Sequence, residues 1–337
     1  MKISIVSPLF RSARYLPSLY VRCVATLERM RIDDYEIILV NDASPEDDLA
    51  VAKRLADHNH RVHVIDLARN YGQQRALMIG FEHTSGDFVF VLDSDLEEDP
   101  EWLESFYQVM IEKQCDVVYG MQTGKKRGFW YRTGRALFLR AIRLLSDVAI
   151  PEGAITARLM SKRYVQAVCR FREHEIDITA VWALAGFAQV PVPVRKLDTS
   201  PTSYTIGKLL RVVINSVTSV STRPLIAGAV LGVVMCLIAL VYTIAVVAAK
   251  LFYDVSIQGW PSLMSAVLIL GGLNLLLTGT VAIYVAKVFI EVKQRPAGLI
   301  RELYSSVKQP LSRGRLETVD NPLARDDGAR HATRSGA

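Results

Sequence analysis

The sequence predicts an α/β fold in which helices flank a mostly parallel sheet, with a pair of apolar helices after it. Over roughly the first 120 residues, short runs rich in valine, isoleucine and phenylalanine alternate with stretches long enough for helices. That alternation is typical of βαβ units, whose strands run parallel. Polar residues follow the first four runs, and two long uncharged runs lie beyond residue 224. We therefore expect one cytosolic domain followed by a membrane anchor.

The apolar runs and the segments between them give the expected order of elements. Strands are expected at residues 3–7, 35–41, 61–67, 87–92 and 116–119. Helices are expected near residues 15–30, 45–58, 72–83, 100–114, 161–170 and 174–186. The two prolines within residues 189–195 favour a strand at the edge of the sheet, where a missing backbone donor is tolerated.

The stretch from Phe88 to Pro100 decides the interpretation of the domain. Five apolar residues form a short buried strand, and the carboxylates after it lie where that strand ends. In an open α/β sheet, ligands bind at the carboxyl ends of the strands. Asp93 and Asp95 are two residues apart and could converge on one hard cation, which carboxylates and substrate phosphates commonly hold together. A solvated acidic loop is the alternative for an Asp-x-Asp pair considered alone.

Polar residues follow the other strands as well. Residues 7–8, 41–45 and 69–72 come after the first three strands and form a rim suited to a base, a ribose and a diphosphate. Taken alone, Asp42 is also a candidate helix cap. No Gly-x-Gly-x-x-Gly follows a strand, and residues 120–126 fall short of a P-loop. The usual dehydrogenases and ATPases are therefore disfavoured.

Two uncharged runs predict membrane spans. Residues 225–249 and 262–286 are each 25 residues long without a charged side chain, and roughly 20 helical residues cross a bilayer. We therefore expect spans at 225–249 and 262–287; buried helices of a soluble core, the alternative, seldom reach this length without a polar face. Basic residues flank the outer ends of the pair, which predicts that residues 1–220 and both termini are cytoplasmic.

Composition limits the partners. The formal net charge is +6, and basic residues gather near the spans. That distribution indicates an anionic membrane surface rather than nucleic acid as the partner. The four cysteines lie far apart without a metal or redox spacing, and reduced thiols are consistent with a cytosolic domain.

Three ordered motifs carry a family resemblance. They are Val-Asn-Asp-Ala-Ser at 40–44, Leu-Ala-Arg-Asn-Tyr-Gly-Gln-Gln at 67–74, and the acidic stretch within 86–101. In order and spacing they resemble family 2 glycosyltransferases of the GT-A fold. With the hairpin and the tail at 284–296, the chain is similar to bacterial polyprenyl-phosphate glycosyltransferases of the two-span type, which are related to dolichol-phosphate mannose synthase. The resemblance covers about residues 2–300.

The resemblance implies which residues bind the donor, a nucleoside-diphosphate sugar. Pro8, Asp42, Arg69 and Asp93 match nucleotide-binding positions of the family. Asp93 and Asp95 would hold Mg²⁺ or Mn²⁺ together with the diphosphate.

Arg158 matches an arginine of the family that faces the phosphates, so Asp93, Asp95 and Arg158 are the catalytic candidates. The chain departs from the family pattern in three places. The acidic residue near positions 11–12 is absent, Thr156 replaces an aspartate, and the Gly-x-Ser-x-Tyr loop reads Ser-Pro-Thr-Ser-Tyr from residue 200. The last two changes bear on a protein base and on the closing loop, and leave the metal and nucleotide positions intact.

A basic and apolar segment near residues 127–148 predicts a helix lying in the membrane interface, because the two kinds of residue separate at helical spacing. Arg127, Arg132 and Arg135 would hold a lipid phosphate there; a solvated basic face on an ordinary surface helix is the alternative. A second interfacial helix is expected near 204–220.

These assignments predict inverting transfer of a sugar from the donor to a polyprenyl phosphate, such as undecaprenyl phosphate, at the cytoplasmic face of the membrane, for cell-envelope glycans. One alternative is a non-catalytic, membrane-tethered scaffold that binds nucleotide sugars. Another is a phosphotransferase with Asp93 as nucleophile. That chemistry requires threonine or valine at the position of Glu97, and it does not explain the two membrane spans.

The resemblance further implies a multi-pass protein of the bacterial plasma membrane and a homotetramer. Residues 288–310 are expected to form a cytosolic juxtamembrane segment. Residues 311–337 have little to bury and are expected to be disordered.

Overall fold

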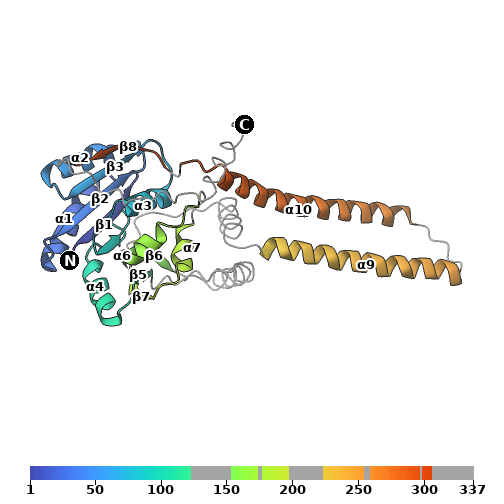
Figure 1. The fold of residues 1–337 in the computed structure, drawn as a ribbon. Helices are drawn as coiled ribbons and strands as arrows, with labels where there is room; N and C mark the ends of the chain where they lie inside the picture. Colours follow the sequence, from blue (N-terminus) through green and yellow to red (C-terminus); the bar gives the residue numbers. More distant parts are fainter. Residues whose placement is uncertain (123–152, 174–176, 197–222, 254–258, 297, 306–337) are drawn as a thin grey trace, which may run out of the picture.

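The computed structural model describes residues 1–122, 153–173, 177–196, 223–253, 259–296 and 298–305. These residues form an α/β domain and two long helices that project from it (Figure 1). The interfacial helices expected near 127–148 and 204–220 lie outside the described residues, as does the expected tail at 311–337.

The domain is built on one mixed sheet that is mostly parallel in its central part. In the described residues it has eight strands in the order β7-β5-β6-β4-β1-β2-β3-β8. Their bounds are Ile3–Leu9 (β1), Tyr35–Asn41 (β2), Val62–Leu67 (β3), Phe88–Val91 (β4), Val117–Gln122 (β5), Ala154–Ser161 (β6), Gln189–Val194 (β7) and Ile300–Tyr304 (β8). Strands β4, β1, β2 and β3 run parallel to one another, β5 runs parallel to β7, and β6 and β8 run antiparallel to their neighbours. The predicted fold class is confirmed, and so are the five first strands and the edge position of β7.

Helices cover both faces of this sheet. Their bounds are Leu16–Arg29 (α1), Asp48–His58 (α2), Gln73–Glu82 (α3), Trp102–Lys113 (α4), Lys162–Val168 (α6) and Ile178–Leu184 (α7). One buried cluster joins the sheet to α1, α2 and α4, and a second joins it to α3, α6 and α7. Gly80 lets α3 approach closely, because a Cβ there would lie 2.6 Å from Val6 Cγ1. This close packing holds the last turn of α3 against β1 and β2.

Strand β8 was not expected from the sequence, which places residues 300–304 in the juxtamembrane segment. It pairs with β3 at the sheet edge, and Leu299 O accepts a hydrogen bond from Ala68 N at 2.8 Å. Lys53 Nζ lies 2.8 Å from Glu302 Oε2, although the two residues are 249 positions apart. The chain therefore returns from the projecting helices to the central sheet.

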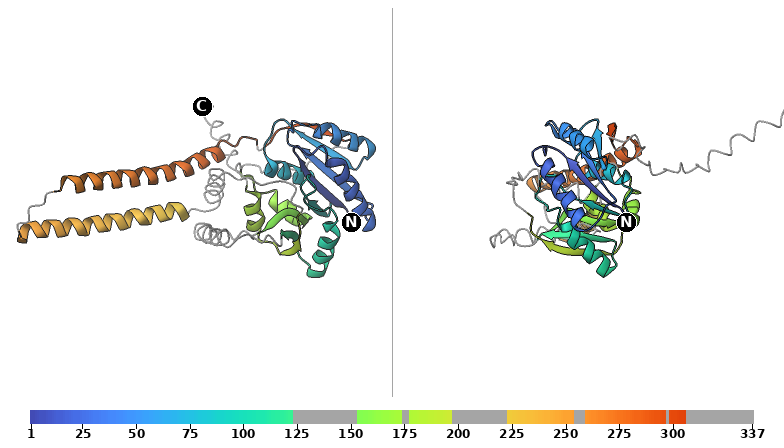
Figure 2. Two further views of the ribbon diagram at one scale, coloured as in Figure 1. Left: turned by 180° about the vertical axis from the view of Figure 1, so that it is seen from behind. Right: turned by 90° about the vertical axis from the view of Figure 1, so that its left-hand side faces the viewer.

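Helices α9 (Arg223–Tyr253) and α10 (Trp260–Val292) cover the two predicted spans. They run side by side away from the domain, as views from the front and from behind both show (Figures 1 and 2). Among the described residues, Ile269–Val292 is long and apolar enough to cross a membrane, and Gly228–Tyr242 is a shorter apolar helix. Most of the exposed large apolar side chains lie on these two helices, as expected of surfaces that face lipid.

Candidate active site

The acidic loop, defined here as residues 92–99, follows β4 at the carboxyl edge of the sheet. Leu96 adopts a left-handed conformation with φ of 59° and turns the chain back on itself. Such a conformation is costly for a bulky residue and persists where surrounding contacts enforce it. Here Glu98 Oε2 accepts a hydrogen bond from Asp93 N at 3.0 Å, and Asp95 Oδ1 accepts one from Glu97 N at 3.0 Å. The loop is therefore held in a defined shape.

Glu98 joins this loop to the neighbouring strand β6. Its side chain is fully buried, and its second oxygen accepts a hydrogen bond from Thr156 N at 3.1 Å. Burial, followed by the negative charge of Asp93, raises the pKa of Glu98 to about 7. Sequence reasoning missed this role, because Glu98 is indistinguishable from its acidic neighbours until the turn at Leu96 is known.

Asp93 receives contacts from three elements. Gln73 Nε2, at the start of α3, donates a hydrogen bond to Asp93 Oδ1, and Lys196 Nζ lies 3.5 Å from Asp93 Oδ2. Burial and the charge of Asp95 raise the pKa of Asp93, while Lys196 and a hydrogen bond with the Thr156 side chain oppose that rise. Thr156, which replaces the family's aspartate, therefore lies beside the acidic loop.

Lys196, just after β7, is the cation that faces Asp93, Glu97 and Glu98 of the loop. Its ammonium lies 3.3 Å from Glu97 Oε2 and 3.8 Å from Glu98 Oε1. Burial would lower the pKa of Lys196, but the four surrounding carboxylates outweigh burial and raise it. No local pattern predicts this contact, because Lys196 is about 100 positions from the loop along the chain.

The acidic loop fits a hard divalent cation that shares its coordination with a substrate. Within the part of the chain that the structure describes, no three histidine, cysteine or acidic side chains gather closely enough to hold a metal ion by themselves. Asp93 and Asp95 nevertheless lie close enough for the charge of one to raise the pKa of the other. Mg²⁺ and Mn²⁺ are commonly held by one or two carboxylates, with waters and substrate phosphates completing the shell.

Asp42 is fixed by the same segment that contacts Asp93. Its carboxylate accepts hydrogen bonds from Tyr71 N at 2.6 Å and from Gly72 N at 2.8 Å. Burial raises the pKa of Asp42 despite these two bonds. The start of α3 thus ties the end of β2 to the end of β4, and Asp42 has a structural role in addition to any contact with a nucleotide.

The other predicted nucleotide-binding residues lie at the same edge. Pro8 is buried near the end of β1, in register with Val40 of β2. Arg69 is exposed after β3, and its guanidinium carbon lies 4.7 Å from the centre of the Tyr71 ring.

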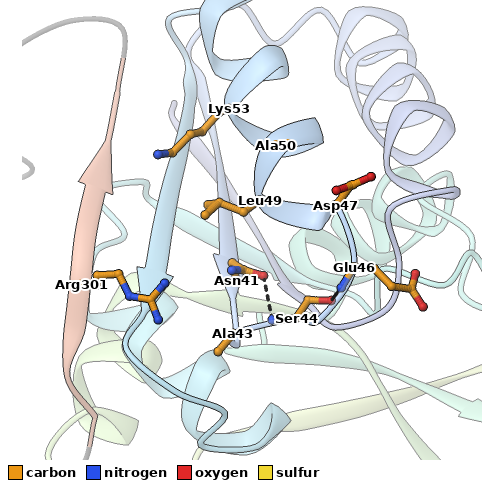
Figure 3. A pocket seen from close by; sticks show the side chains of 9 residues that line it. All are labelled: Asn41, Ala43, Ser44, Glu46, Asp47, Leu49, Ala50, Lys53 and Arg301. Carbon is orange, nitrogen blue, oxygen red and sulfur yellow. Dashed lines mark hydrogen bonds between the residues drawn. The ribbon is translucent and has the colours of Figure 1, made fainter.

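A hollow of about 520 Å³ opens beside the end of β2. Asn41 of β2, Lys53 of α2 and Arg301 of β8 are among the residues that line it, and the Arg301 guanidinium points toward Asn41 (Figure 3). Asn41 Nδ2 donates to Asp66 Oδ1 at 2.8 Å, and Arg301 lies 3.4 Å from the other oxygen of Asp66. The hollow therefore lies on the α2 side of the sheet. Its lining includes both sequence neighbours of Asp42, and no residue of the acidic loop.

Arg158 lies on β6, opposite Val91 of β4. Its guanidinium carbon is 3.0 Å from the centre of the Trp182 ring, and Nη2 donates to Ile155 O at 3.1 Å. Burial lowers its pKa to about 9. It lines a cavity of about 250 Å³ below α7 and makes no ion pair within 4.0 Å in the described parts of the chain. The structure thus places Asp93 and Asp95 in one loop, within range of each other's charge, and places Arg158 on the neighbouring strand, where it lines a separate cavity.

The three arginines predicted to hold the acceptor phosphate, Arg127, Arg132 and Arg135, lie outside the described residues. Their positions relative to the acidic loop therefore stay a prediction.

Comparison with known proteins gives a consistent set of relatives. Residues 4–168 match the family "Glycosyl transferase family 2". A Mycobacterium tuberculosis protein described as "Putative glycosyltransferases" is 38% identical over 306 residues, covering 91% of this chain and 89% of the relative. The undecaprenyl-phosphate 4-deoxy-4-formamido-L-arabinose transferase of Sodalis glossinidius is 29% identical over 318 residues, covering 92% and 96%. Among solved structures, S. aureus TarS 1-349 in complex with UDP-GlcNAc matches with a TM-score of 0.44 at 16% identity, covering 65% of this chain and 66% of that one.

Proposed function

The chain belongs to glycosyl transferase family 2, and on that premise we propose that it transfers a sugar, with inversion, from a nucleoside-diphosphate sugar to a polyprenyl phosphate at the cytoplasmic face of the membrane. The Sodalis relative, whose name states an undecaprenyl-phosphate sugar transferase and which aligns over nearly its whole length, supports this acceptor class. The product would be a polyprenyl-phosphate-linked sugar for cell-envelope glycans.

One observation carries the proposal. Asp93 and Asp95 lie in a loop of fixed shape at the carboxyl edge of the sheet, tied by Glu98 to β6 and by Gln73 to α3. In this position the two carboxylates would hold Mg²⁺ or Mn²⁺ against the donor's diphosphate. When bound, the cation would stabilise the negative charge that develops on the departing diphosphate.

The chain's own residues are suited to an acceptor that is already ionised. The second pKa of a phosphate monoester is about 6, so the attacking oxygen needs little deprotonation near neutral pH. That chemistry is compatible with Thr156 in place of an acidic residue. Arg127, Arg132 and Arg135 would orient the lipid phosphate toward the sugar.

The membrane topology belongs to the same proposal. Helices α9 and α10 would cross the bilayer at residues 225–249 and 262–287, with residues 1–220 and the segment 288–310 in the cytoplasm. The exposed apolar surface of the two helices supports this arrangement, and the return of β8 to the sheet supports a common side for both ends.

The proposal is tested by incubating membranes that contain the full chain with undecaprenyl phosphate, Mg²⁺ or Mn²⁺ and a panel of nucleotide sugars, followed by mass spectrometry of the lipids. We expect one donor to give a lipid-phosphate sugar. Asp95→Ala should lower the rate by at least about 100-fold, the scale of losing one electrostatic contact to a developing charge. Asp33→Ala, an exposed aspartate at the opposite edge of the sheet, is the matched control and should leave the rate unchanged.

Two results would contradict different parts of the proposal. Full activity of Asp95→Ala would remove the metal role of the acidic loop. Binding of a nucleotide sugar without transfer to any lipid phosphate would favour the scaffold alternative.

A further inference from the structure

The position of Lys196 carries an inference that rests on the proposed metal role of Asp93. Its ammonium lies among three carboxylates of the acidic loop, 3.5 Å from Asp93 Oδ2, 3.3 Å from Glu97 Oε2 and 3.8 Å from Glu98 Oε1. All three contacts come from a residue just after β7, which is not part of the loop. The acidic loop therefore contains a cation supplied by the chain itself.

Both oxygens of Asp93 are engaged in this arrangement. Gln73 Nε2 donates to Oδ1, and the Lys196 ammonium faces Oδ2. A divalent cation and an ammonium cannot both lie against one carboxylate oxygen without strong repulsion, because two positive charges a few ångströms apart in a partly buried site are poorly screened. Coordination through Oδ2 therefore requires Lys196 to move.

The geometry of Lys196 permits that movement. Its three contacts are longer than the usual 2.7–2.9 Å of a charge-assisted hydrogen bond, so the ammonium is shared among the carboxylates and not locked to one. The side chain is 19% exposed, and a lysine stem is flexible. Glu97 offers the nearest carboxylate to which the ammonium can shift.

We propose that Lys196 is a positioning residue that competes with the divalent cation for Asp93. Without a cation, Lys196 offsets part of the negative charge of the acidic loop and holds Asp93, Glu97 and Glu98 near one another. When a cation binds, Lys196 leaves Asp93 and lies nearer Glu97. Binding of the metal and binding of Lys196 at Asp93 exclude each other.

The test measures binding of Mn²⁺ alone to the full chain in detergent, by calorimetry and by the loss of the free Mn²⁺ signal in electron paramagnetic resonance. Lys196→Met keeps the length of the side chain and removes its charge, so it should bind Mn²⁺ about tenfold more tightly or better, since a like charge near the ligand oxygen is gone. Lys196→Arg keeps the charge and should stay near the wild-type affinity. Lys113→Met replaces an exposed lysine on α4 and should leave the affinity for Mn²⁺ unchanged.

A second measurement uses the unaltered protein and does not depend on the folding of a variant. Acetylation of lysines with an N-hydroxysuccinimide ester, followed by peptide mass spectrometry, should modify Lys196 faster when Mn²⁺ is present. The rate at Lys113 should not respond to Mn²⁺.

The outcomes separate this inference from the function on which it rests. Equal or weaker Mn²⁺ binding by Lys196→Met, with binding by the wild type intact, would overturn the competition alone. If neither protein bound Mn²⁺, the competition and the proposed metal role of Asp93 would both be wrong. Faster acetylation of Lys196 in the presence of Mn²⁺, together with tighter Mn²⁺ binding by Lys196→Met, would support both the competition and the metal role of Asp93.

Discussion

A glutamate is buried at each end of the parallel strands of the central sheet, at the amino edge and at the carboxyl edge, and the two glutamates have very different partners. Glu36 stands at the start of β2, in register with Ser4 at the start of β1. Glu98 stands beyond the end of β4, in the acidic loop. Both side chains are almost fully buried, so the contrast between them comes from their partners.

The amino edge provides Glu36 with a full set of partners. Lys2 Nζ lies 2.7 Å from Oε2, Ser4 donates to Oε1 at 2.6 Å, and Ser85 donates through both its N–H and its hydroxyl at 2.7 Å. Burial by itself would raise the pKa of Glu36, but these partners outweigh it and lower the pKa. The ionised form of Glu36 therefore stabilises the folded protein.

The carboxyl edge leaves negative charge in excess. Glu98 accepts two backbone hydrogen bonds but lies beside Asp93, and its pKa rises to about 7. One lysine, Lys196, faces several carboxylates there. The difference indicates that one edge is arranged for stability, while the other concentrates negative charge with fewer partners, as functional sites often do.

The largest effect on this comparison should come from Glu36→Ala. Removing the carboxylate takes away the ion-pair partner of Lys2 and leaves the Ser4 hydroxyl and the Ser85 amide without this acceptor. Removing one partner of a buried ion pair costs about 3–5 kcal/mol of unfolding free energy. Urea unfolding of the full chain in detergent, followed by tryptophan fluorescence, measures it. Because the folded-state pKa of Glu36 is lowered, its contribution is present above the ordinary glutamate range and is lost as the pH falls through the folded-state value.

A matched control is available at the same edge. Asp33→Ala removes an exposed carboxylate and should change the unfolding free energy by no more than about 0.5 kcal/mol. A cost for Glu36→Ala as small as that of Asp33→Ala would contradict the structural role of Glu36.

A smaller effect, with the opposite dependence on pH, is expected from Glu98→Gln. The folded state of the wild type keeps a proton up to about pH 7 that the unfolded chain loses from the ordinary glutamate range upward. Raising the pH through this window therefore destabilises the wild type by up to about 1.4 kcal/mol per pH unit. The variant cannot ionise, so between pH 5 and 7 it should gain roughly 2 kcal/mol relative to the wild type.

The pH dependence of the difference is the diagnostic quantity, measured with EDTA present to exclude metal ions. The absolute stability of Glu98→Gln also includes the loss of one acceptor oxygen, which is the same at every pH. Parallel pH profiles for the two proteins would contradict the raised pKa of Glu98.

The same contrast explains what the sequence could predict. The strands and the positions of Asp93 and Asp95 follow from local patterns, because an apolar run followed by acids marks a strand and its end within a few residues. The prolines at 191 and 193 marked β7 as an edge strand for an equally local reason. These expectations are confirmed wherever the described residues include them.

The contacts that could not be predicted join distant parts of the chain. Lys196 reaches the acidic loop from beyond β7, and Trp182 of α7 covers Arg158 of β6. Strand β8 has only five residues, and it forms because β3 offers a free edge, which no local pattern in residues 300–304 reveals. Such contacts depend on the completed fold, and they decide the charge balance of the site.

The smallest effect is expected at the lateral edge, where β8 meets β3 and α2. The Lys53–Glu302 pair is 2.8 Å long, but its side chains are 29% and 46% exposed, so water screens the attraction. A double-mutant cycle with Lys53→Met and Glu302→Gln should give a coupling free energy of about 0.2–1 kcal/mol. Coupling as large as the cost of Glu36→Ala would show that this edge, too, relies on a buried charge. Weak coupling with unchanged transferase activity would show that β8 is held by its backbone pairing with β3. The contrast between stability and function would then be confined to the ends of the strands, at Glu36 and at Glu98.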